Sequence, residues 1–109
     1  MNEPANPRIR APQTARRGDV VEIKTLITHP METGQRVDTG GKPIPRKILK
    51  AFACSMNGAE VFAATLEPAI SANPYLAFFL RIDGPAVLGF AWTDDDGTVH
   101  RAEHRIAIG

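Results

Sequence analysis

The chain has 109 residues, of which 43% are apolar, 23% charged and 6% aromatic. This composition is typical of one folded domain and excludes a disordered or collagen-like chain. Thirteen basic and twelve acidic side chains leave a formal net charge of +1, so no basic excess indicates nucleic-acid binding. A single cysteine, Cys54, excludes an internal disulfide and any site that needs two thiolates.

No segment approaches the roughly 18 consecutive apolar residues that a membrane-spanning helix needs, so we expect no membrane span. Residues 1–13 contain three prolines and two arginines but no apolar run of about 7 to 15 residues, and we therefore expect no export signal in this sequence. We interpret residues 1–109 as a single domain in which residues 1–8 form a flexible amino-terminal tail.

Apolar and charged side chains alternate in residues 20–28, which predicts a strand with one buried face. A short extended segment around Ile9 could pair as an edge strand. Residues 29–45 lose the alternation and contain three prolines and three glycines. Such a loop exceeds the usual length of about 12 to 15 residues, and loops of this kind are usually functional or mobile.

Residues 47–56 alternate again and predict a second strand, with Cys54 on its buried face. The dipeptide Asn57-Gly58 follows, and both residue types tolerate the positive φ angles of a tight hairpin turn. We therefore expect residues 60–66 to return antiparallel to the preceding strand.

Residues 75–82 form the most apolar run, and two aromatic side chains lie on its odd-numbered parity. If the even-numbered residues face the core, Tyr75 and Phe79 face outward, and exposed aromatic residues on a sheet often mark a protein interface. A covering loop or the second sheet could bury them instead, because a strand that is apolar on both faces also fits a wholly buried position. We expect an interface that includes Tyr75 and Phe79, together with Leu49 from a neighbouring strand.

Two further strands are predicted at residues 86–93 and 98–108, joined by a hairpin turn at Asp96 and Gly97. The whole chain then contains about seven short strands, separated by turns rich in glycine, asparagine, aspartate and proline. This pattern predicts an all-β protein, an immunoglobulin-like antiparallel β-sandwich. The usual pair of immunoglobulin cysteines is absent, so only the architecture is inferred.

The inventory of catalytic residue types is small. Cys54 could act as a nucleophile if a neighbouring base or cation lowered its pKa, but its parity favours an inert thiol in the core. Ser71 and His29 are the other ingredients of a nucleophile and base, and no nucleophile elbow surrounds the serine.

Two patterns near the carboxyl end resemble metal sites without meeting their spacing rules. His100 and His104 would be about 13 Å apart along a strand, too far for one metal ion, so we expect two exposed histidines. The three aspartates 94–96 precede a glycine but lack the alternate spacing of a calcium loop, and a hairpin turn explains them better. We predict no catalytic, cofactor or metal site in this chain.

Several strings of the sequence resemble the SoxZ family, the smaller subunit of the SoxYZ sulfur-carrier complex of bacterial thiosulfate oxidation. The similarity extends from about residue 9 to residue 108. The strings are VEIKTLI at 21–27, HPMETGQR at 29–36, IPRKI at 44–48, LEPAISANPY at 66–75 and WTDDDG at 92–97.

The resemblance implies a periplasmic immunoglobulin-like sandwich that binds SoxY as a heterodimer. In this family a cysteine in a glycine-rich arm of SoxY carries the sulfur intermediates, while other Sox enzymes load, oxidise and hydrolyse them. This chain ends without such an arm, so we expect a non-catalytic subunit whose Cys54 carries no sulfur. The resemblance also suggests export together with SoxY, which supplies the targeting sequence.

We expect residues Met31, Glu32 and Arg36 of the long loop to dock other Sox enzymes transiently. Two alternatives from other functional classes stay open. One is a calcium-dependent adhesion or binding module that uses the aspartates at 94–96, and the other is a small thiol enzyme that uses Cys54.

Overall fold

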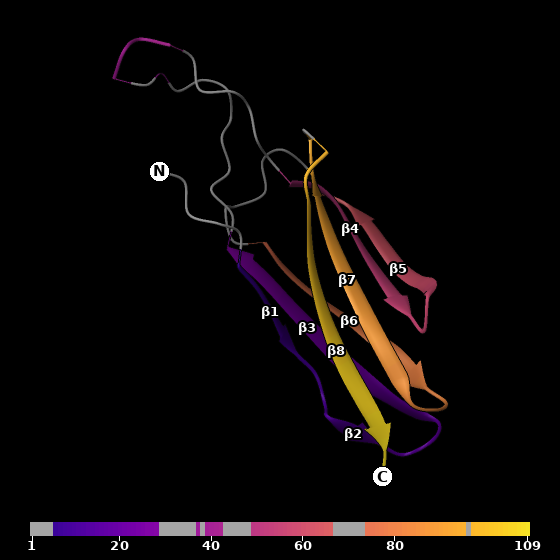
Figure 1. Ribbon diagram of the computed structural model, residues 1–109. Coiled ribbons are helices and arrows are strands. Elements are labelled where there is room, and N and C mark those ends of the chain that lie inside the picture. Colours follow the sequence, from indigo (N-terminus) through magenta and orange to yellow (C-terminus); the bar gives the residue numbers. More distant parts are fainter. Residues whose placement is uncertain (1–5, 29–36, 38, 43–48, 67–73, 96) are drawn as a thin grey trace.

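The computed structural model describes residues 6–28, 37, 39–42, 49–66, 74–95 and 97–109. These residues form two β-sheets that face each other (Figure 1). The described part contains no helix that could cross a membrane. The eight strands are β1 (Asn6–Arg10), β2 (Thr14–Ala15), β3 (Asp19–Thr28), β4 (Leu49–Met56), β5 (Ala59–Thr65), β6 (Tyr75–Ile82), β7 (Ala86–Asp94) and β8 (Val99–Ile108).

The smaller sheet has the strand order β1-β3-β6, and both of its strand pairs are antiparallel. Side chains of β3 alternate between buried and exposed along its length, because successive residues of a strand point to opposite faces. Thr25 is the buried polar member of the inner row, and its hydroxyl donates to the carbonyl oxygen of Leu76 on β6 at 3.3 Å. The predicted strand at 20–28 and its edge partner around Ile9 are therefore confirmed.

The larger sheet has the order β2-β8-β7-β4-β5. Its first hairpin, between β4 and β5, turns at Asn57 and Gly58 with φ angles of 52° and 88°, as the dipeptide predicted. The Asn57 side chain also links this turn to the start of β7: its Oδ1 accepts from the Val87 amide at 2.8 Å, and its Nδ2 donates to the Pro85 carbonyl at 3.2 Å.

The chain passes from one sheet to the other between β1 and β2, and the sequence did not predict this crossing. Thr14 and Ala15 pair in parallel with Ala107 and Ile108 of β8, so one pairing of the sandwich is not antiparallel. A strand of two residues has no detectable alternation, which explains why seven strands were expected and eight are observed. Residues 6–8 pair with β3, so the predicted tail over residues 1–8 does not include them.

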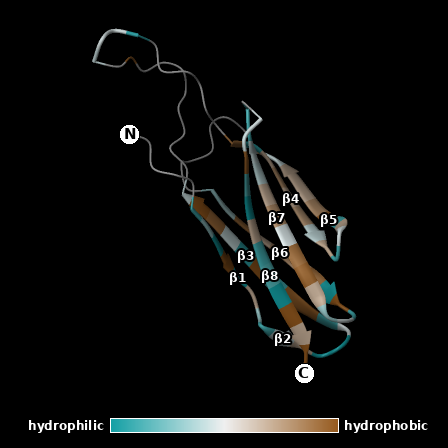
Figure 2. Cartoon of the chain, viewed as in Figure 1, coloured by the Kyte–Doolittle hydropathy of each residue, from teal (hydrophilic) through white to brown (hydrophobic). Residues whose placement is uncertain are grey.

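The core lies between the two sheets and is built around aromatic side chains. Phe52 of β4 contacts four other rings at centroid distances of 5.1 to 6.3 Å, and Phe62 stacks on Phe78 at 4.3 Å with an interplanar angle of 2°. Figure 2 shows the corresponding alternation of hydrophobic and hydrophilic residues along β3, β7 and β8. The predicted all-β sandwich is thus confirmed, and its inner faces agree with the expected parity.

Candidate partner-binding surface

The outer face of the three-stranded sheet carries the two outward aromatic side chains that the sequence predicted. Tyr75 is 57% exposed and Phe79 65% exposed, whereas the intervening Phe78 is only 6% exposed. The alternation along β6 is therefore complete, and the alternative of a wholly buried strand is wrong. A large apolar side chain that remains in water on a sheet face is a common mark of an interaction surface.

Cross-strand neighbours extend this pair into a patch. Tyr75 lies opposite Leu26 of β3, and Val20 of β3 lies opposite Arg81, one position along the face from Phe79. Val20 is exposed and Leu26 is half-buried. Diagonal neighbours in a sheet are within reach of aromatic side chains, so four outer residues add apolar area to this face, and we call them the β3–β6 patch (Val20, Leu26, Tyr75 and Phe79). The charged pair Glu22 and Lys24 lies on the same face, with Glu22 opposite Phe79 and Lys24 opposite Ala77.

β6 is an edge strand, and this position also favours binding of another chain at the patch. β6 is the last strand of its sheet, next to β3, and within the described residues no strand pairs with its other edge. An edge strand presents backbone donors and acceptors that another chain can use, and proteins normally guard such edges with charges or cover them. Here the edge carries two exposed aromatic rings, with Arg81 as the charged residue of its outer row.

Leu49 does not belong to this surface, and its expected place in the interface is wrong. Its side chain is 0% exposed and packs in the core. The pairing of β4 with β7 is irregular between Leu49 and Ala51, so Leu49 lies opposite Asp94 while Ala51 lies opposite Thr93. An extra residue in one strand shifts the alternation by one, which turns Leu49 inward although its parity indicated an outward side chain.

The other three predicted interface residues, Met31, Glu32 and Arg36, lie outside the described residues. So do Ser71 and His29, which the sequence offered as a nucleophile and base.

Cys54 is buried as expected. Its side chain is 0% exposed, between Phe62 and Phe90 in the strand register, and burial raises the pKa of the thiol from 9.0 to about 11. The thiolate is the reactive form of cysteine, so at neutral pH this residue is almost entirely the unreactive thiol.

The two histidines of β8 are half-buried, which corrects the expectation that both are exposed. His100 Nε2 lies 3.0 Å from Oδ2 of Asp94, and His104 Nε2 donates to the carbonyl oxygen of Pro12 at 2.9 Å. Their ring nitrogens thus face different partners, on different parts of the chain. Among the residues that the structure describes, no group of three or more metal-ligating side chains comes together.

The aspartate-rich segment forms the turn between β7 and β8. Asp94 accepts from the amide of Gly97 at 3.0 Å and donates its own amide to Thr98 at 2.8 Å, and Gly97 has a φ of 92°. The Asp94 carboxylate is fully buried beside His100, while Asp96 lies outside the described residues. The hairpin interpretation therefore accounts for Asp94 without a metal ligand role.

The fold defines the class: an immunoglobulin-like β-sandwich, here with exposed apolar side chains at one sheet edge. Comparison with known families gives the particular group. The chain belongs to the SoxZ family, because the family model described as sulphur oxidation protein SoxZ matches residues 9–105. It is therefore a protein of the Sox sulfur-oxidation system.

Solved structures with the same fold cover nearly the whole chain. A superoxide reductase (neelaredoxin) from Ignicoccus hospitalis matches with a TM-score of 0.72 at 15% identity, over 94% of this chain and 80% of that one. The sulfur carrier protein SoxY from Chlorobium limicola f thiosulfatophilum matches with a TM-score of 0.68 at 15% identity, over 94% and 78%.

A CARDB domain from Pyrococcus furiosus, solved in complex with di-metal ions, matches with a TM-score of 0.63 at 12% identity, over 98% of this chain and 94% of that one. At these identities the structural similarities establish the fold alone. Comparison with curated proteins gave no match.

Proposed function

We propose that this chain is the non-catalytic subunit of a SoxYZ heterodimer and that it supports the covalent carriage of sulfur intermediates by SoxY during thiosulfate oxidation. Membership of the SoxZ family supports the Sox assignment. The observation that carries the binding role is the exposure of Tyr75 and Phe79, at 57% and 65%, on an edge strand.

Covering this patch with a partner is favourable in free energy, because it removes apolar surface from water. Aromatic side chains bury about 150 to 250 Å² each, and at about 25 cal/mol per Å² the covering of two rings favours association by several kcal/mol before binding costs. Two exposed rings on an edge strand also invite nonspecific aggregation. A permanent partner on the β3–β6 patch would gain this association free energy and would also prevent the aggregation.

The state of Cys54 supports the division of labour between the two subunits. A sulfur carrier needs a thiol that solvent and enzymes can reach, and the only cysteine of this chain is buried with its pKa raised to about 11. We therefore assign the carrier cysteine to SoxY. Other Sox enzymes would be transient partners, and the complex would act in the periplasm after export together with SoxY.

Calorimetric titration of SoxY into the folded chain tests the interface. Truncation of a central aromatic anchor, Tyr75→Ala or Phe79→Ala, is expected to raise Kd by about tenfold or more, the effect of an interface hot spot. Val61→Ala removes a partly exposed apolar side chain from β5 of the other sheet and serves as the matched control, with Kd unchanged. Unchanged Kd in both folded aromatic variants would place the interface elsewhere.

The long loop provides a separate test of the transient partners. Alanine at Met31, Glu32 and Arg36 is expected to slow turnover of the carrier complex by Sox enzymes while the thermal midpoint barely moves, because a docking loop contributes little to the core. A large fall in the midpoint with normal turnover would contradict the docking role and indicate a structural loop.

A further inference from the structure

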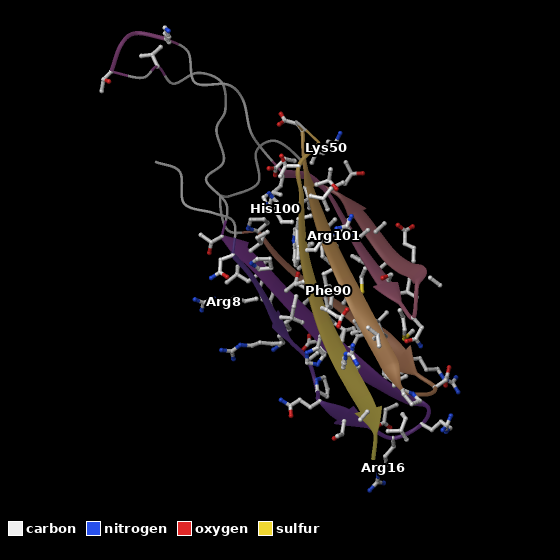
Figure 3. All side chains as sticks on the ribbon, in the orientation of Figure 1. Arg8, Arg16, Lys50, Phe90, His100 and Arg101 are labelled. Atoms are coloured by element: carbon white, nitrogen blue, oxygen red, sulfur yellow. The ribbon has the colours of Figure 1, made fainter. Side chains whose placement is uncertain are left out.

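Three cationic side chains gather around a hollow beside the β3–β6 patch. Arg8 and Arg10 are on the exposed face of β1; Arg10 lies opposite Lys24 of β3 and Arg8 lies opposite Leu26. Figure 3 shows Arg8 extending away from β1 on the outer side of the sandwich. The hollow has a volume of about 310 Å³ and is lined by Arg8, Arg10, Lys24, Thr25, Leu26 and Tyr75.

Among the described residues, the charges around this hollow are only partly paired. Lys24 Nζ lies 3.4 Å from Glu22 Oε1, and both side chains are more than 40% exposed, so water and salt weaken this pair. Within the described part of the chain no acidic side chain pairs with Arg8 or Arg10. Two other surface arginines do have acidic partners: Arg81 is paired with Asp83 at 2.9 Å and Arg105 with Glu103 at 3.4 Å. The exposed Arg16, Arg17 and Arg101 resemble Arg8 and Arg10 in having none among the described residues, so the cluster around the hollow, and not the lack of a partner, distinguishes Arg8 and Arg10.

The pairing of Arg10 with Lys24 is unfavourable for folding, because like charges directly opposite each other destabilise a sheet. Charges on an edge strand can guard it against aggregation, and this would account for Arg8 and Arg10 on β1. It does not account for Lys24, which is on the central strand of the sheet. A cationic cluster that lowers stability and surrounds a hollow is typical of a ligand site.

We propose that this hollow binds a sulfur oxyanion, a terminal –SO₃⁻ group of the thiosulfate class. The guanidinium of arginine offers a planar fork of N–H donors to oxyanions, and lysine adds a point charge. A single arginine satisfies a carboxylate, whereas three cations with one half-exposed acidic neighbour leave an excess of positive charge and enough donors for a group with three oxygens, carried either by the dianion thiosulfate or by a singly charged sulfonate adduct. The choice of sulfur rests on the proposed function.

Two sources can supply this group: free thiosulfate, or a sulfonate-terminated adduct on the cysteine of the SoxY arm. The hollow shares Tyr75 and Leu26 with the β3–β6 patch, so it lies at the rim of the proposed SoxY interface. An adduct held there would be kept near the complex between visits to enzymes, and the exposed site would release it readily.

The first test uses the isolated full-length chain and thiosulfate, followed by amide NMR at low ionic strength, where screening is weak. We expect saturable shifts at residues 8–10, 24–26 and 75, with acetate at least about fivefold weaker as the carboxylate control. Arg10→Ala should weaken thiosulfate binding about tenfold, and Arg105→Ala, an exposed arginine of β8, should leave it unchanged.

Absence of saturable shifts, equal binding of acetate, or equal effects of Arg10→Ala and Arg105→Ala would overturn the proposal. This test needs no SoxY, so its failure is distinguishable from failure of the heterodimer proposal. A second experiment compares the same amides in the complex with SoxY before and after its arm cysteine is loaded with a thiosulfonate. Shifts on loading support the carrier adduct as the source, and thiosulfate binding to the free chain without them supports the free anion.

Discussion

The outer faces of the two sheets differ sharply in the size of their side chains. Where β4 and β7 of the larger sheet pair with each other, most of their outward residues are small, and the exposed Lys50 and Val87 lie near the ends of these strands. A Cβ atom added at Gly89 would lie 2.8 Å from Ser55 Oγ, so a larger side chain at position 89 would clash with Ser55 unless Ser55 moved. The small residues are Ala51, Ala53, Ser55, Gly89, Ala91 and Thr93, and a hollow of about 610 Å³ lies over part of them.

The smaller sheet presents the β3–β6 patch and the cationic side chains instead. Small side chains remove little apolar area from water when a partner covers them, so a face of alanine, glycine and serine gains little from association. A face with Tyr75 and Phe79 gains far more. This difference supports the interface that we propose on the three-stranded sheet, although the larger of the two hollows lies on the other sheet.

Adjacent phenylalanines on β6 give the sharpest form of this comparison. Phe78→Ala should lower the free energy of unfolding by about 3 to 5 kcal/mol, because it leaves a cavity against Phe52 and Phe62. Phe79→Ala should lower it by less than about 1 kcal/mol, since its ring is in water in the isolated chain. Chemical denaturation of the two variants measures both values, with Phe78→Leu as a milder substitute if the alanine variant does not fold. Equal losses would show that Phe79 is covered within the chain.

Charge insertion tests which outer face meets SoxY. Phe79→Asp should raise Kd for SoxY by about a hundredfold or more, because an unpaired carboxylate would be buried in the interface. Ala53→Asp introduces the same charge on the small-residue face and should change Kd by less than about threefold if that face stays in water. Calorimetric titration with both folded variants decides the matter. The opposite ranking would move the interface to the five-stranded sheet.

Cys54 is an inner residue of β4, so we expect its substitution to affect stability and not sulfur carriage. Cys54→Ser should lower the free energy of unfolding by about 1 to 3 kcal/mol, because it buries a more polar group where Cys54 Sγ now makes only a long contact of 3.7 Å to the Ser55 carbonyl oxygen, while sulfur carriage by the complex is retained. Loss of the sulfur adduct from a complex with this folded variant would contradict the assignment of the carrier to SoxY.

The raised pKa of Cys54 makes the free energy of unfolding depend on pH. The thiol ionises near pH 9.0 in the unfolded chain and near 11 in the folded chain, so the unfolded state releases its proton first as the pH rises. Stability from this group is complete below pH 9 and declines between about pH 9 and 11. Urea denaturation of the wild type and Cys54→Ala across this range isolates the effect, because the two proteins share every other titratable group. Parallel curves would show that the thiol is accessible.

Alternation and turn chemistry were sufficient to predict most of the strands. The period of two along β3 and β6 separated the two rows of each strand and put Tyr75 and Phe79 in the same row, and the structure shows that this row is exposed. Asn57 and Gly58 identified a hairpin because few residues adopt positive φ angles. These signals depend on residues close together in the sequence, so they can be recognised without knowing the rest of the fold.

Contacts between distant residues were not predictable in the same way. The irregular pairing near Leu49 reversed the face of that residue, and the partner of His104 is Pro12, near the other end of the chain. The cationic hollow could not be predicted from the sequence, because Arg10 and Lys24 are far apart along the chain and only the strand register places them opposite each other.

The sequence by itself determined the fold class, the family resemblance and which side chains of β6 share a face, because successive residues of a strand point to opposite sides. It left open whether the outer row of β6 faces water or a covering layer. The tertiary structure decided which outer rows become one surface: Tyr75 beside Leu26, and Arg10 opposite Lys24. The physical reason is that strand register is set by long-range pairing and by bulges, and a shift of one residue changes every cross-strand neighbour.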